Sequence, residues 1–214
     1  MKKIGYFLLC FFPLISYADD TVFHNGIHFT EINHVAPVTN TGKIEVVEVF
    51  WYACQHCFRF EPHVTQWKTA LADDVVFQRI PGVLSKHWVL LAKVFYAATI
   101  LGVEEKMTPI IFHHIHKKKA PLNKIKQVEA LFVANGVTSE DFNRAIKSFA
   151  VNTKVGQAKS LNKRYGLSGV PTIIVDGRYR VDSGSIGSFE KVIEITRFLV
   201  NMTREARLKK TASK

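Results

Sequence analysis

The apolar and polar positions in the first part of the chain predict two strands with a helix between them. Residues 44–50 (IEVVEVF) form a short, β-branched apolar run, which is typical of a buried central strand. Residues 75–80 form a second such run, ended by a Pro-Gly pair. Between the two runs, residues 58–71 repeat apolar side chains at three- and four-residue steps, which predicts a helix. Pro62 lies inside this segment, so we expect a kink there.

The middle of the chain has a helical pattern throughout. From residue 85 to about residue 149, apolar positions recur at helical spacing. Asn135-Gly136 predicts the end of one helix, and residues 138–141 (TSED) predict the start of the next. A further helix is expected over residues 152–165, with Gly166 as its C-terminal cap.

The last part of the chain returns to strands and closes on a helix. Residues 172–175 and 179–181 flank Asp176-Gly177, a pair that strongly favours a hairpin turn. Residues 188–200 have the pattern of a helix. Residues 204–214 are basic with little apolar periodicity, so we expect a flexible tail there.

This order of elements predicts an α/β fold with a mixed central sheet. The helical block interrupts the sheet-forming segments, so we interpret it as an inserted all-helical domain. The expected organisation is a cleaved N-terminal segment over residues 1–18, a first α/β part over 19–83, the helical insertion over 84–150, a second α/β part over 151–203 and the basic flexible tail over 204–214.

The first eighteen residues have the three-part pattern of a secretory signal peptide. Two lysines precede an apolar stretch over residues 4–15, and Ser16-Tyr17-Ala18 supplies the small residues that a signal peptidase recognises. The apolar stretch is shorter than the roughly 20 residues that a transmembrane helix needs. A lipid-anchored start at Cys10 is less favoured, because the bulky Leu9 precedes it. We therefore expect export and cleavage after Ala18.

Removal of the signal takes Cys10 with it and leaves two cysteines, Cys54 and Cys57. In an oxidising compartment, paired cysteines become disulfides. A bridge across two intervening residues closes a very small loop, and in the loop-entropy picture such loops stabilise a fold least. The pair therefore favours redox chemistry over a structural role.

Cleavage also lowers the formal net charge from +11 to +9, because the signal contains two lysines and no acidic residue. A basic exported protein favours anionic membrane surfaces or acidic clients, although a well-solvated surface is the simpler interpretation. The sequence lacks the basic patch with interleaved aromatic residues that is typical of nucleic-acid binding, so we expect no nucleic-acid partner. The remaining chain of about 196 residues suffices for one domain with an insertion.

The segment Cys54-Gln55-His56-Cys57 lies where the first predicted strand gives way to a helix. The unpaired backbone N–H groups and partial positive charge at a helix start favour an anion. We therefore predict that Cys54 is the attacking thiolate and that Cys57, one turn further in, is the buried resolving thiol. A protonated His56 adds positive charge beside the Cys54 sulfur, which lowers the pKa of the thiol further.

Metal and haem sites are the alternatives for a CxxC segment. A structural zinc needs four ligands, and the chain has no second CxxC. The histidine cluster at His113, His114 and His116 is interpreted as a solvated or partly packed helix face. A haem attachment site needs histidine after the second cysteine, where Phe58 stands. We therefore expect no metal and no cofactor.

Two further segments are candidates for the site. Pro171 follows Val170 and directly precedes a predicted strand, where either a cis proline facing the reactive site or an ordinary trans proline fits. Glu48 interrupts the first strand, six residues before Cys54. A buried carboxylate there has a raised pKa and can accept or return the Cys57 proton, whereas a wet strand face is the alternative. The apolar neighbours favour the proton role.

Residues 48–61 (EVFWYACQHCFRFE), the helical insertion and residues 169–172 (GVPT) resemble the DsbA family of bacterial periplasmic dithiol oxidases. The likeness extends over nearly the whole mature chain. It implies a thioredoxin-like fold in which Cys54 is the nucleophile, Cys57 its buried partner and His56 the stabiliser of the thiolate.

The same resemblance implies that Pro171 is cis, with Val170 before it in a client-binding loop, and that Glu48 is the buried acid. One position departs from the family's pattern, because Gln55 stands where the familiar Pro-His dipeptide has proline. His56 keeps the positive charge, while the loss of proline removes rigidity and frees a backbone N–H. The oxidase role is expected, and its oxidising strength is left open.

The expected function is that of a periplasmic oxidase, which donates its Cys54–Cys57 disulfide to exported proteins with free thiols. The resemblance implies re-oxidation by a DsbB-like membrane partner that passes electrons to quinone. An isomerase or reductase of the DsbC or DsbG kind is disfavoured, because only about 25 mature residues precede the first strand. A non-catalytic chaperone or metal-binding module is the remaining alternative, which the paired cysteines disfavour.

Overall fold

The structure is a computed structural model that describes residues 22–33, 36, 38 and 42–213. The expected signal peptide, its cleavage after Ala18 and Cys10 lie outside these residues. Within them, no helix combines the length and the apolar character that a bilayer crossing requires.

A five-stranded mixed sheet organises the chain, in the order β1-β5-β4-β2-β3. Its strand β2 is parallel to β3 and antiparallel to β4, and the β4–β5 and β5–β1 pairs are antiparallel. The predicted α/β fold with a mixed sheet is therefore confirmed. The strands are β1 (Thr30–Glu31), β2 (Ile44–Phe50), β3 (Val75–Pro81), β4 (Thr172–Val175) and β5 (Tyr179–Asp182).

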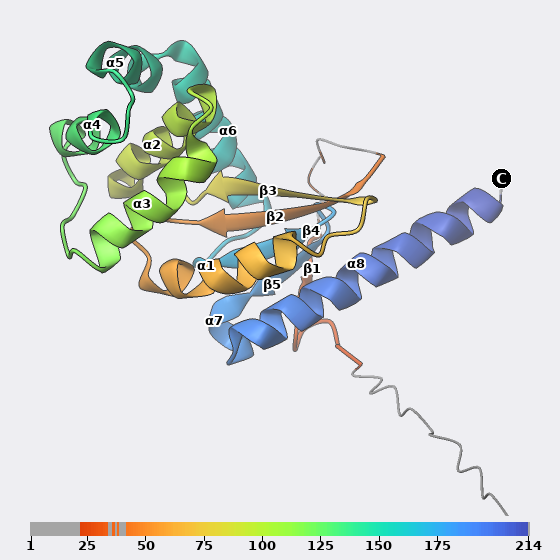
Figure 1. Cartoon of the computed structure of the whole chain (residues 1–214). Helices are drawn as coiled ribbons and strands as arrows, with labels where there is room; N and C mark the ends of the chain where they lie inside the picture. The colour runs from red at the N-terminus through yellow and green to blue at the C-terminus, as the bar shows by residue number, and fades with distance from the viewer. Residues whose placement is uncertain (1–21, 34–35, 37, 39–41, 214) are drawn as a thin grey trace, which may run out of the picture.

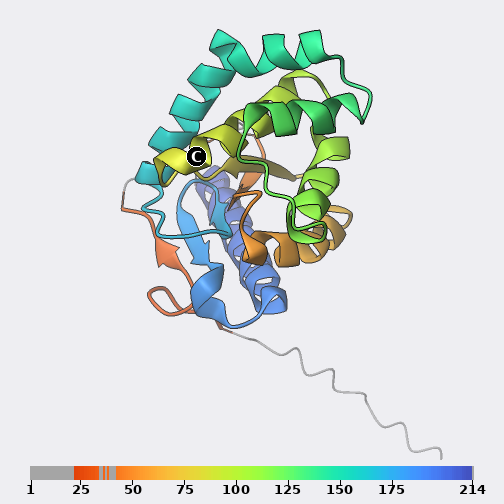
Figure 2. The same ribbon diagram turned by 90° about the vertical axis from the view of Figure 1, so that its left-hand side faces the viewer.

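Helices cover both faces of this sheet (Figure 1). One face carries α1 and α8, and the other carries the block from α2 to α6, which Figure 2 shows from the side. The helices are α1 (Gln55–Lys68), the 3₁₀ turn η1 (Lys86–Trp88), α2 (Val89–Ile100), α3 (Glu104–His116), α4 (Ile125–Val133), α5 (Ser139–Lys147), α6 (Phe149–Arg164), α7 (Ser183–Ile186) and α8 (Phe189–Ala212).

Strand β2 is buried along its whole length, as its apolar run predicts. Ile44 and Val46 contribute to the core beneath α1 and α8, while Val47 and Val49 contribute to the core beneath the helical block. Because side chains alternate across a strand, one apolar segment fills both cores. Full burial of such a side chain is worth roughly 1.5–3 kcal/mol.

The predicted hairpin at Asp176-Gly177 joins β4 to β5. Both residues have positive φ, 53° and 64°, which is the conformation that a tight hairpin turn requires. A Cβ on Gly177 would lie 2.3 Å from the backbone oxygen of Ala36, so only glycine fits there.

Several expected boundaries were wrong. Helix α1 begins at Gln55 rather than at residue 58 and ends at Lys68, so the cysteines lie at its start. The expected domain boundary after residue 150 falls inside α6, a continuous helix that packs on both α2 and β3. One helix therefore joins the helical block to the second α/β part.

The expected flexible tail is instead the end of α8, which remains helical to Ala212. Arg204 forms an ion pair with Asp74 at 2.6 Å, and Arg207 forms one with Asp176 at 2.6 Å. These contacts attach the C-terminal half of the helix to loops at the end of the sheet. The segment lacks apolar periodicity because polar side chains make its contacts.

Candidate functional site

The two cysteines lie at the N-terminus of α1, directly after β2. The Cys54 N–H donates to the Trp51 carbonyl at 2.9 Å, which turns the chain into the helix. Cys54 is the N-cap residue, with φ −83° and ψ 119°, and its Sγ accepts a hydrogen bond from the Cys57 N–H at 3.3 Å. Both cysteines are thiols in this structure. The Cys54 sulfur thus receives an N–H group that a helix start leaves unpaired.

The two thiols have opposite environments. Cys57 is fully buried, whereas Cys54 is partly exposed. Hydrogen bonds from the Cys57 thiol, and then from the backbone N–H groups of Cys57 and His56, lower the pKa of Cys54 to about 7 against the opposing effect of partial burial. Burial, and then the neighbouring Cys54, raise the pKa of Cys57 well above its usual value. Near neutral pH, Cys54 therefore has substantial thiolate character while Cys57 remains a thiol.

His56 acts on the Cys54 sulfur through its backbone N–H. Its side chain is exposed and lines an open groove of about 560 Å³ beside the cysteines, together with Arg59, His63 and Phe189. The guanidinium of Arg59 lies 5.8 Å from the centre of the Phe189 ring. Stabilisation of the Cys54 thiolate by a charged His56 ring stays a prediction. The groove is the open surface next to that ring.

The loop before β4 approaches the cysteines. The Cys54 thiol donates to the Val170 carbonyl at 3.4 Å, and the Val170–Pro171 peptide bond is cis, the isomer that the family resemblance implies. A Cβ on Gly82 would lie 3.2 Å from the Val170 side chain and 2.8 Å from the Trp88 ring. Glycine at position 82 therefore allows the loop to lie close to the end of β3.

Glu48 is buried in β2, as its apolar neighbours predict, and it faces a basic residue that sequence reasoning missed. Arg79 lies opposite Glu48 on β3 and donates from Nε to its carboxylate at 2.8 Å. The same guanidinium donates to Glu61 on α1 at 2.7 Å. Burial raises the pKa of Glu48, and the positive charge of Arg79 opposes that rise only in part. The signal for Arg79 was a single cation in a mostly apolar strand, directly after Gln78.

His116 is the second residue that sequence reasoning missed as part of the site. Its ring stacks on Phe58 with 4.8 Å between ring centres. Its Nε2 is 2.8 Å from the Tyr52 carbonyl oxygen and its Nδ1 is 3.0 Å from Gln55 Oε1. The interpretation of the histidine cluster as a solvated or partly packed helix face agrees with the structure, because His113 is exposed and His114 and His116 are half-buried. Helical spacing alone carried no signal for the specific contacts of His116.

A second contact also joins the helical block to the turn before Cys54. The buried Tyr52 hydroxyl lies 3.0 Å from Thr108 Oγ1, and Thr108 donates to Glu104 at 3.0 Å. Burial raises the pKa of Tyr52, so its hydroxyl keeps its proton. Helix α3 thus supports the turn before Cys54 through the hydrogen bonds from Tyr52 to Thr108 and from Thr108 to Glu104, as well as through His116.

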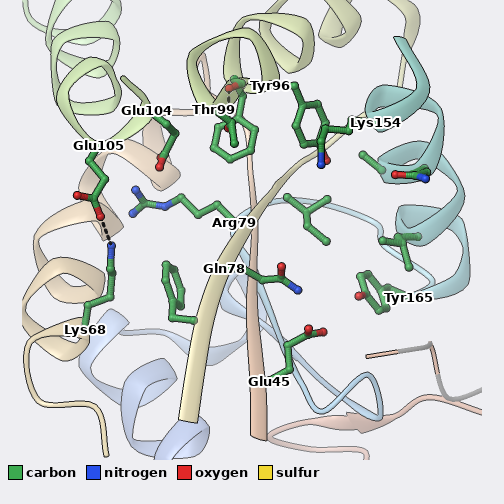
Figure 3. A pocket seen from close by; sticks show the side chains of 16 residues that line it. Glu45, Lys68, Gln78, Arg79, Tyr96, Thr99, Glu104, Glu105, Lys154 and Tyr165 are labelled. Carbon is green, nitrogen blue, oxygen red and sulfur yellow. Dashed lines mark hydrogen bonds and ion pairs between the residues drawn. The ribbon is translucent and has the colours of Figure 1, made fainter. Parts of the chain in front are cut away.

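A separate cavity of about 410 Å³ lies along β3, and neither cysteine lines it (Figure 3). Figure 3 shows acidic and basic side chains around it, with Lys68 and Glu105 paired on one side. The Lys68 nitrogen lies 3.9 Å from the Glu105 carboxylate. Among the described residues, no group of three or more His, Cys, Asp or Glu side chains is placed to hold a metal ion. The candidate site is the start of α1, where the two thiols Cys54 and Cys57 lie.

Comparison with known proteins gives a consistent result. The family described as DSBA-like thioredoxin domain matches residues 45–194. The chain is 38% identical over 182 residues to the thiol:disulfide interchange protein DsbA of Pseudomonas syringae pv. tomato, covering 85% of each chain. It is 35% identical over 195 residues to DsbA of Pseudomonas aeruginosa, covering 91% of this chain and 92% of that protein. The crystal structure of Pseudomonas aeruginosa DsbA matches with a TM-score of 0.83 over 89% of this chain and 98% of that one, at 35% identity.

Proposed function

Because the chain belongs to the DSBA-like thioredoxin family and is a thiol:disulfide oxidoreductase, we propose that it is an exported oxidase, which donates its Cys54–Cys57 disulfide to client proteins. The opposite pKa shifts of the two cysteines carry this proposal. A lowered pKa of Cys54 stabilises the reduced enzyme, which makes the oxidised enzyme a stronger oxidant, a relation for which DsbA itself is the usual example.

The reaction begins when a client thiolate attacks Cys54 Sγ of the oxidised enzyme. A new sulfur–sulfur bond forms, the Cys54–Cys57 bond breaks, and its electron pair goes to Cys57, which takes up a proton because its pKa is raised. A second client thiolate then attacks the client sulfur of the mixed disulfide. The client gains a disulfide, and Cys54 leaves as a thiolate that the backbone N–H groups stabilise. The client loses two electrons and the enzyme gains them.

Two neighbouring groups have supporting roles in this proposal. Glu48 exchanges the Cys57 proton, which its raised pKa and its electrostatic effect on Cys57 support. The Val170 carbonyl, bound to the Cys54 thiol in the reduced enzyme, pairs with client backbone once Cys54 carries the client instead of a hydrogen. Pro171 has no backbone N–H, so the Val170–Pro171 peptide unit offers the client only a hydrogen-bond acceptor.

The place of action follows from the N-terminal pattern and from the family. We propose that residues 1–18 direct export to the periplasm and that cleavage follows Ala18. The clients are exported proteins with free thiols. A DsbB-like membrane quinone reductase re-oxidises the Cys54–Cys57 pair after each turnover.

Mixing oxidised mature protein with a reduced two-cysteine client peptide tests the proposal. We expect the peptide disulfide to form while the enzyme is reduced, and no reaction with Cys54→Ser. Reduced Cys57→Ser, mixed instead with the oxidised peptide, should attack the peptide disulfide through Cys54 and stop at the mixed disulfide, because it has no second thiol to resolve it. The equilibrium with glutathione then gives the reduction potential. A potential near thioredoxin's value of about −270 mV contradicts the oxidase role and favours the reductase or isomerase alternative.

A further inference from the structure

We propose that His116, the last residue of α3, is a positioning residue that fixes the active-site turn through Gln55. This inference rests on the proposed function, because it concerns the redox properties of the Cys54–Cys57 pair. His116 comes from the helical block, and Gln55 is 61 positions away in sequence at the first residue of α1.

The His116 ring contacts the chain on both sides of Cys54. Its Nε2 binds the Tyr52 carbonyl, two residues before Cys54, at 2.8 Å. Its Nδ1 binds Gln55 Oε1, one residue after Cys54, at 3.0 Å. The ring face also stacks on Phe58 at 4.8 Å with an interplanar angle of 13°. One imidazole thus connects the turn before the nucleophile to the first turn of the helix after it.

This bridge persists in either protonation state of the imidazole. The Tyr52 carbonyl only accepts hydrogen bonds, so Nε2 carries a hydrogen. In the imidazolium form, Nδ1 donates to Gln55 Oε1. In the neutral form, Nδ1 accepts from the amide NH₂ of Gln55, whose oxygen and nitrogen ends exchange by rotation of the side chain.

The bridge matters because the low pKa of Cys54, which depends first on the Cys57 thiol, also depends on the direction of the backbone N–H groups after Gln55. The N–H groups of His56 and Cys57 stabilise the Cys54 thiolate, and both follow Gln55 directly in the chain. In the family's familiar Pro-His dipeptide, the proline ring restrains this position covalently. Here Gln55 lacks that restraint, and its side chain is held by His116 instead. The helical block therefore takes part in setting the strength of the oxidant.

The test compares His116→Phe, Gln55→Ala and the double variant in the full mature protein. Phenylalanine keeps the stack on Phe58 but loses both hydrogen bonds. We expect the equilibrium between the enzyme disulfide and glutathione to shift three- to tenfold toward the enzyme disulfide. A tenfold shift corresponds to about 30 mV for a two-electron couple. The Cys54 thiol, followed by its ultraviolet absorbance, should titrate at higher pH than in the unaltered protein.

The double variant separates positioning from independent effects. Because Gln55→Ala and His116→Phe remove the same contact, we expect their combined effect to be smaller than the sum of the single effects. His113→Phe is the matched control, since His113 is exposed on the same last turn of α3. A potential and thiol pKa unchanged in His116→Phe, or fully additive single effects, would overturn the proposal.

A third variant keeps the test decisive if His116→Phe folds poorly. His116→Gln retains an N–H donor for the Tyr52 carbonyl, so we expect a shift smaller than that of His116→Phe. Gln55→Ala changes an exposed position at the start of α1 and reports on the same contact. Failure of the oxidase proposal is distinguishable from failure of the His116 proposal, because the first appears as a thioredoxin-like reduction potential in the unaltered protein.

Discussion

Cys54 and Glu48 are two anion sites in one strand–helix unit, and the protein stabilises them in different ways. Backbone N–H groups at the start of α1 point at the Cys54 sulfur, which is partly exposed to solvent. The Glu48 carboxylate is buried in β2 and bound by the guanidinium of Arg79, itself shared with Glu61. One site relies on dipoles and the other on a full countercharge.

This difference suits a charge that appears and disappears during the reaction. When Cys54 enters a disulfide, its negative charge is lost, and N–H dipoles at an open helix start are still reached by water. Water cannot reach a buried guanidinium in the same way to replace a lost carboxylate, so the loss of a partner is costly there. The redox centre is therefore built from backbone groups, while Arg79 is a fixed cation of the core that keeps Glu61 as a partner when Glu48 takes up a proton.

The strongest test of this comparison removes the countercharge. Arg79→Met leaves Glu48 buried without a cation, so we expect the free energy of unfolding at pH 7 to fall by about 3–5 kcal/mol. Urea unfolding measures this change. Because burial raises the pKa of Glu48 above its ordinary value of 4.5, the loss should shrink as pH falls toward that ordinary value and the carboxyl takes up a proton.

Arg178→Met provides the matched control for this experiment. Arg178 pairs with Glu31 at 2.7 Å, but both side chains are more than two-fifths exposed. We expect a loss of no more than about 1 kcal/mol there. Equal losses for the two variants would contradict the assignment of Arg79 as a core cation.

The next test concerns the pH dependence that the Cys54 thiolate gives to the reduced protein. The pKa of Cys54 is about 7 in the folded state, below the value of 9.0 for an unperturbed thiol. A group with a lowered folded pKa adds stability that is full above the unfolded pKa and is lost as pH falls through the folded pKa. The reduced protein should therefore gain stability between about pH 7 and pH 9, by roughly 1–2 kcal/mol after allowance for solvent screening.

Urea unfolding of the reduced protein, with the oxidised protein as reference, measures this gain. Above about pH 9 the sign reverses, because Cys57 has a raised folded pKa and ionises more readily in the unfolded chain. Cys54→Ala should remove the rise between pH 7 and pH 9. The same rise in that variant would show that another group is responsible.

A smaller change is expected for Glu48→Gln. The amide has nearly the shape of the carboxyl and accepts a hydrogen bond from Arg79, which also keeps Glu61. We therefore expect a loss of about 1 kcal/mol in unfolding free energy, well below that of Arg79→Met. The charge of Glu48 raises the pKa of Cys57, so that pKa should fall in the variant. Client oxidation at an unchanged rate would argue against the proposed proton role.

The smallest effect is expected at the end of α8. Arg204→Ala removes the pair with Asp74, whose side chains are about a third or more exposed. We expect a loss below about 1 kcal/mol, measured by thermal or urea unfolding. A loss of several kcal/mol would mean that this end of α8 is as integral to the fold as the Arg79 cluster.

Local patterns were sufficient for much of the fold and for the chemistry of the site. The β-branched run of β2, the helical block and the Asp176-Gly177 turn each depend on neighbouring residues, and each was predicted. Boundaries were predicted less accurately, because the start of α1 at Gln55 depends on the turn after Phe50 and on the Cys54 cap.

Sequence alone placed Cys54 and Cys57 between the end of a strand and the start of a helix, because capping and helix dipoles act over a few neighbouring residues. Which distant side chains complete the site depended on tertiary packing. His116 reaches Gln55 across 61 positions, and Arg79 reaches Glu48 across 31. Such contacts depend on how helices and strands pack against one another. The apolar periodicity of one segment does not indicate which residue of another segment it will contact. The contacts at the end of α8 are likewise tertiary, because its ion pairs join residues that lie far apart in the chain.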